Sequence, residues 1–128
     1  MRRGARDERG QALVEFALVL PILALLLFAI VQFGIVFTQY LALTDAVRAG
    51  AREAAVSRLA PDPAVSVESS VRRAAVNLDQ AELTVSVAST WRRGDPVTVS
   101  ARYPYELNLL GVGLRSGTLE SETTERVE

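Results

Sequence analysis

The stretch FALVLPILALLLFAIVQFGIVF, from Phe16 to Phe37, decides how this chain of 128 residues is organised. It has no charged side chain, and the charge-free segment continues to Thr44. As a helix that rises 1.5 Å per residue, it measures about 33 Å, which matches a hydrocarbon core of about 30 Å. A buried helix of a soluble domain is the alternative, but the rest of the chain is too small to surround it. The sequence therefore predicts a transmembrane segment over about residues 16–38.

Basic residues before the apolar segment indicate its orientation. They are Arg2, Arg3, Arg6 and Arg9. A positive flank stays in the cytoplasm, so we expect a single-pass protein of the bacterial cytoplasmic membrane with its C-terminal domain outside. Further arginines between residues 48 and 58 weaken this asymmetry. A removed signal peptide fits poorly, because the apolar run is long, lacks an A-x-A site and is followed by continued helical periodicity.

Gly10 and Glu15 stand at the start of the apolar segment, in the order Arg9-Gly10-Gln11-Ala12-Leu13-Val14-Glu15-Phe16. A carboxylate at the edge of a membrane segment is costly, so it is expected to have a partner or a role. If the chain is cut after Gly10, Gln11 becomes the N-terminus and Glu15 the fifth residue. In a bundle of such helices, Glu15 pairs with a neighbour's α-ammonium group and sets the axial register. Alternatively, Glu15 only reaches the headgroups or contacts Arg9.

This pattern resembles the class III signal of the Tad (Flp) pilus system, in which a basic leader ends in glycine, four residues follow, and Glu-Phe comes next. The wider stretch RGQALVEFALVLPILALLLFAIVQFG, with AVRAGAREAAV after it, is similar to TadE-like pilus-assembly proteins over about residues 9–56. The resemblance implies that Gly10 is the cleavage residue. It also implies that a prepilin peptidase recognises the signal to which Glu15 and Phe16 belong, and that Gln11 is the first residue afterwards.

The family resemblance implies a minor pseudopilin or pilus-assembly component, because a bulk filament subunit has little chain beyond its helix. Its implied partners are the prepilin peptidase, other pilins and minor pseudopilins, the Tad assembly platform and inner-membrane lipid. The protein is then expected in the membrane or in a surface pilus that serves adhesion or secretion. The alternative is an unprocessed, signal-anchored binding domain with a structural role in the envelope.

Two features of the long helix concern packing. Pro21 removes one helical hydrogen bond and is expected to kink the axis, either as a flexible point for leaving the bilayer or as an ordinary membrane-helix kink. Ala46, Gly50 and Ala54 recur every fourth residue, a spacing that lets another backbone approach closely. This row of small residues packs against partner subunits or against the protein's own sheet.

The C-terminal region predicts a small α+β domain. The first helix is expected to end near residue 60, before Pro61-Asp62-Pro63, and Asp62 to cap a second helix. Alternating residues predict strands over 83–87 and 97–103 joined by a turn at Gly94-Asp95, with a third strand over 118–127. Pro104 and the glycines at 111, 113 and 117 are expected to interrupt the pattern. The domains are then a leader (1–10), a helix (11–60) and an extracytoplasmic α+β domain with an antiparallel sheet (61–128).

Composition argues against catalysis. The chain has no histidine and no cysteine, so the commonest general base and the thiol nucleophile are missing. It has no glycine-rich phosphate loop and no carboxylate cluster suited to a metal. Its net charge of −1 does not favour a nucleic-acid partner. We therefore expect no enzyme activity, no cofactor, no metal and no small-molecule substrate.

Overall fold

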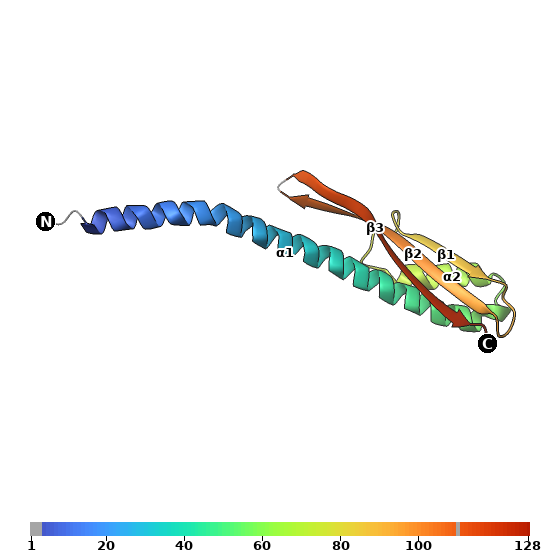
Figure 1. Cartoon of the computed structure of the whole chain (residues 1–128). Helices are drawn as coiled ribbons and strands as arrows, with labels where there is room; N and C mark the ends of the chain where they lie inside the picture. Colours follow the sequence, from blue (N-terminus) through green and yellow to red (C-terminus); the bar gives the residue numbers. More distant parts are fainter. Residues whose placement is uncertain (1–3, 110) are drawn as a thin grey trace.

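The structure, a computed structural model, describes residues 4–109 and 111–128, with side chains from Gly10 onward (Figure 1). A long helix is followed by a short second helix and an antiparallel sheet. The elements are α1 (Gly4–Val56), a 3₁₀ turn (Ser57–Leu59), α2 (Pro63–Ala74), β1 (Thr84–Ser89), β2 (Pro96–Leu109) and β3 (Val112–Arg126). This arrangement confirms the predicted α+β class.

Helix α1 has two parts with different surroundings. Its N-terminal part extends alone, whereas its C-terminal part lies beside α2 and the sheet (Figure 1). The helix ends at Val56, and the 3₁₀ turn continues to Leu59, so the chain stops being helical where Pro61 was expected to stop it. Burial begins at Leu43 and recurs at Val47, Ala51 and Ala54, on the face that the domain covers.

Helix α2 begins as predicted. Asp62 is its N-cap, and the Asp62 Oδ1 atom accepts a hydrogen bond from the Val65 backbone N–H at 3.2 Å, while Pro63 occupies the first helical turn. Val67 and Val71 are buried under α1. The apolar stripe continues past the end of the helix through buried Ala75 and Leu78.

The sheet is antiparallel in the order β1-β2-β3, and the two helices cover one of its faces. Its pairing sets Val87 opposite Val99, and Val99 opposite Thr123. Alternate residues of β2 point into the core, namely Val97, Val99, Ala101 and Tyr103. The β1–β2 hairpin and its turn therefore agree with the sequence prediction.

The β2–β3 hairpin is longer than the sequence predicted. The expected interruption is wrong at Pro104 and Gly117, since β2 runs through Pro104 to Leu109 and β3 runs from Val112 through Gly117. At Gly111 it is confirmed, because this residue lies in the turn between the strands with a φ of 84°. The last residue of β2 that pairs with β1 is Arg102, so Pro104 lies where β2 has become an edge strand, a position that tolerates proline. Gly117 lies opposite Tyr105, and a Cβ atom there would meet the tyrosine ring at 2.8 Å. The tyrosine covers the glycine, and the ladder continues.

Gly50 makes the closest approach between α1 and the domain. A Cβ atom at this position would lie 2.3 Å from Val71 Cγ2 and 3.4 Å from Val99 Cγ1. Both valines are fully buried and β-branched, so their side chains have little freedom to move away. Only glycine allows α1, α2 and β2 to meet at this point.

We expect Gly50→Leu to lower the free energy of unfolding of the domain by about 1–3 kcal/mol, because the added atoms overpack a closed core. Thermal unfolding of the full chain in detergent, followed by near-ultraviolet circular dichroism, measures this loss. Gly34→Leu is the matched control, since no atom lies within 4 Å of a Cβ at Gly34. Equal midpoints for the two variants would contradict the packing described.

Candidate functional site

The N-terminal part of α1, from Phe16 to Phe37, is an apolar rod that the described residues leave almost entirely uncovered. Its large side chains are exposed, for example Phe16 at 59% and Phe33 at 68%. Among the described residues, one helix is long and apolar enough to cross a membrane, and no part of its most apolar window is buried in the chain. A core helix of a soluble protein is mostly buried, so the exposure argues against that alternative. The rod must contact lipid or other apolar helices.

The predicted processing residues lie together on the first turns of this rod. Gly10 and Gln11 are helical and exposed, and a Cβ atom at Gly10 would meet nothing within 4 Å. The Gln11 side-chain amide donates a hydrogen bond to Glu15 Oε1 at 3.0 Å, one helical turn away. Phe16 follows with an exposed ring. The four residues therefore form a continuous accessible surface, and the carboxylate has no buried contact. The alternative partner Arg9 has a side chain outside those described.

Glu15 lies close to the end that a cut after Gly10 would create. At 1.5 Å per residue, Glu15 is about 6 Å along the axis from Gln11. A new helix N-terminus there carries a positive charge on its amino group and unpaired backbone N–H groups. Carboxylates near such an end are stabilised by the helix dipole. The geometry thus suits an electrostatic contact between Glu15 and a newly formed N-terminus.

Pro21 lies inside α1 without ending it. The helix continues on both sides of the proline, and Figure 1 shows only a gentle curvature of its N-terminal part. The missing N–H leaves the carbonyl of Ala17 without its usual helical donor. Pro21 therefore does not end the helix, and the kink expected there stays a prediction.

The predicted row of small residues lies inside the protein. Ala46 and Ala54 are fully buried, and Gly50 between them lies directly against Val71 and Val99. These residues bring α1 against α2 and β2 of the same chain. The row is consequently covered by the protein's own domain, while the opposite face of the same segment stays exposed at Arg48, Arg52 and Val56.

The structure brings no reactive cluster together. No group of three or more His, Cys, Asp or Glu side chains that could hold a metal occurs in the part of the chain that the structure describes. The ion pairs found there are exposed, for example the Arg102–Glu120 pair at 3.0 Å between β2 and β3. Such pairs are typical of a solvated surface and add little stability.

Sequence reasoning missed one polar contact beside the apolar rod. The Gln32 side-chain amide donates a hydrogen bond to the Asn108 backbone carbonyl at 2.8 Å. The sequence did contain an indication of this contact, since Gln32 is the one side chain between Phe16 and Phe37 that has hydrogen-bonding groups. A lone amide in an apolar segment calls for a partner.

Comparison with known proteins gives one match. The family model described as TadE-like protein matches residues 10–52, from the predicted cleavage residue to Arg52 near the end of α1. No curated protein and no solved structure matches the chain. The matched segment contains the apolar rod, Glu15 and most of the small-residue row. Over this segment the chain is similar to TadE-like pilus assembly proteins, and the match confirms the resemblance indicated by Gly10, Glu15 and the helix that follows.

Proposed function

We propose that this protein is a minor pseudopilin or assembly component of a Tad-type pilus, which a prepilin peptidase cleaves after Gly10. The observation that carries the proposal is the position of Gly10, Gln11 and Glu15 at the head of an apolar helix whose first turns are exposed among the described residues. The family match over residues 10–52 supports a role in such a system. The protein acts by assembly rather than by catalysis, and the chemical step is the cleavage of its own chain.

Accessibility of the cleavage signal supports processing at the membrane surface. Gly10 and Gln11 are exposed, and both precede the apolar rod. A peptidase must bind an extended segment, so the first turns of α1 have to unwind locally. Helix ends open easily because their backbone hydrogen bonds have few neighbours to support them. The basic leader stays on the cytoplasmic side until it is removed.

Assembly then uses the apolar rod and its carboxylate. A helix with large exposed apolar side chains on every face packs against other such helices once it leaves lipid. In a low-dielectric bundle an unpaired carboxylate is strongly disfavoured. Pairing of Glu15 with the α-ammonium group of a neighbouring subunit removes this penalty at one axial offset only. The packed core of the domain, with α2 and β1, remains outside the membrane and is available to other pilins or to the assembly platform.

We expect the mature protein to begin at Gln11, and the Gly10→Leu variant to retain the leader. Intact-mass measurement of the membrane-derived protein, with and without the host's prepilin peptidase, tests this. A Cβ at Gly10 meets no other atom, so the variant perturbs recognition and not the fold. Gly34→Leu, the same change on the same helix, should be processed normally. A wild-type mass that still begins near Met1 would instead favour an unprocessed, signal-anchored domain.

We expect Glu15→Gln to be depleted several-fold from sheared surface filaments while its cleaved form persists in the membrane. The amide keeps the size of the side chain and a hydrogen bond to Gln11, but it lacks the charge that pairs with an α-ammonium group. Quantitative immunoblotting of sheared and membrane fractions measures the ratio, with Glu122→Gln on exposed β3 as the control. Equal ratios for the two variants would exclude the register role. Wild-type protein confined to the membrane would indicate an assembly component.

A further inference from the structure

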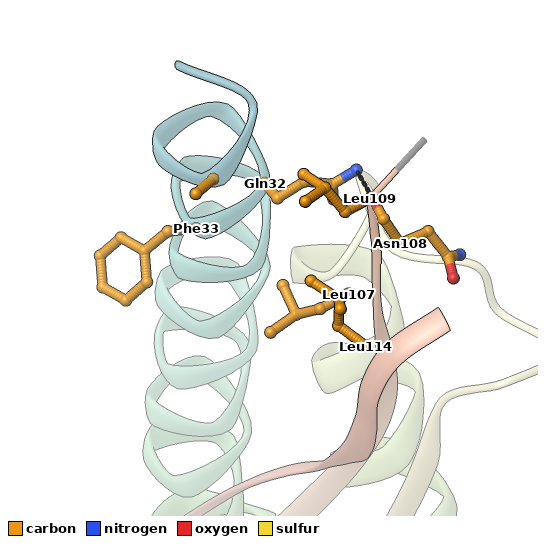
Figure 2. A pocket seen from close by; sticks show the side chains of 7 residues that line it. Gln32, Phe33, Leu107, Asn108, Leu109 and Leu114 are labelled. Carbon is orange, nitrogen blue, oxygen red and sulfur yellow. Dashed lines mark hydrogen bonds between the residues drawn. The ribbon is translucent and has the colours of Figure 1, made fainter. Parts of the chain in front are cut away.

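The β2–β3 hairpin extends past β1 and returns along α1 toward the exposed rod (Figure 1). We call residues 107–109 and 112–114 the hairpin tip. Between the tip and α1 lies a groove of about 240 Å³ with an almost entirely apolar lining. It is lined by Ala29, Gln32 and Phe33 from the helix and by Leu107, Asn108, Leu109 and Leu114 from the tip. Figure 2 shows Leu107 and Leu114 between the hairpin and the helix.

The contact between Gln32 and Asn108 fixes the height of the tip along α1. The hydrogen bond of 2.8 Å satisfies the only polar side chain of the apolar stretch and, at the same time, a backbone carbonyl of the hairpin (Figure 2). Both groups need partners if they lie in a medium without water. The hairpin thus supplies one hydrogen-bond partner to an amide within the membrane segment.

This height lies within the membrane segment of α1. Gln32 is about 24 Å along the helix from Phe16 at 1.5 Å per residue. With a hydrocarbon core of about 30 Å that begins at Phe16, Gln32 is about 6 Å below the outer boundary. Any molecule that surrounds the rod at Ala29 and Phe33 therefore also surrounds the hairpin tip.

The composition of the hairpin changes at the same boundary. The tip exposes Val112 at 64% and Leu114 at 65%, and its other large side chains, Leu107 and Leu109, are half-buried. Further from the tip, Tyr105, Glu106 and Glu82 line a more polar groove beside Val36 and Gln39. Asn108 in the tip and Arg115, which pairs opposite Leu107, are the polar exceptions, and the long arginine side chain can reach back toward the water. Tyrosines and charged groups at one level, with mainly apolar side chains beyond it, form the pattern of a membrane–water interface.

From these observations we propose that the hairpin tip inserts into the outer leaflet of the membrane that α1 spans, as a second lipid contact of the chain. The tip continues the lipid-facing surface of the helix, and the Gln32–Asn108 bond holds it at that depth. Among the residues that the structure describes, no further strand lies beside the outer edges of β2 and β3 at the tip, so unpaired backbone groups limit the insertion to the boundary region. The inference rests on the membrane-spanning part of the proposed function, and on neither cleavage nor pilus assembly.

Tryptophan fluorescence in lipid nanodiscs tests the insertion. The chain has a single tryptophan, Trp91, in the β1–β2 turn at the other end of the sheet. With Trp91→Phe as background, we expect the tryptophan of Val112→Trp to be quenched by acyl-brominated lipids and protected from aqueous acrylamide. Glu122→Trp on the same strand, about 33 Å away at 3.3 Å per residue, should show the opposite response. The expected difference in lipid quenching between the two is several-fold.

Two further variants make each outcome decisive. The tryptophan of Phe28→Trp reports on the rod itself. If brominated lipid does not quench its fluorescence, the membrane-spanning assignment fails. If brominated lipid quenches Phe28→Trp but not Val112→Trp, only the insertion of the tip is wrong. Leu114→Trp repeats the measurement at a second exposed position if Val112→Trp does not fold. Nanodiscs loaded with one copy distinguish lipid from protein. Protection from acrylamide that occurs only with several copies would assign the tip to contacts between subunits and overturn the proposal.

Discussion

The exposure of the first half of α1, which the described residues leave almost entirely uncovered, is the constraint on which the rest of the structure depends. Exposed phenylalanine, leucine and isoleucine side chains on all faces of a helix are strongly disfavoured in water, and residues 4–109 and 111–128 leave them uncovered. The helix therefore requires a second medium, first lipid and then, in an assembly, other helices. Glu15 and Gln32 gain their importance from this requirement, because a polar group matters most where water is missing.

The second half of α1 meets the opposite demand, since it must hold a small domain with a limited core. Small residues solve this problem: at Gly50 the helix lies so close to Val71 and Val99 that even one methyl group has no room. The close approach buries Leu43 and Val47 completely, so that the helical layer and the sheet share a single core. The same helix therefore suits an apolar medium in its first half, through large side chains, and a closely packed core in its second half, through small ones.

Local patterns in the sequence predicted much of this fold. The Pro61-Asp62-Pro63 boundary, the Asp62 cap and the alternation in β1 and β2 are near-neighbour effects, so they can be seen without a structure. The length of the β2–β3 hairpin could not be predicted in this way, because proline and glycine usually end strands. Pro104 is tolerated because β1 has already ended, and Gly117 because Tyr105 covers it, and both reasons involve residues distant in sequence. For the candidate site, Gly10 and Glu15 were recognisable from spacing, whereas the partner of Gln32 required the folded hairpin.

Because α1 continues without a break from Gly4 to Val56, it acts mechanically as a rigid shaft. A helix advances 1.5 Å and turns 100° for each residue, so a change in its registration against neighbouring helices by one residue rotates the whole domain by more than a quarter turn. Force applied to the domain reaches the buried end of the shaft with no flexible linker to absorb it. The orientation of the sheet on the outside is thereby set by the rotational position of the helix inside.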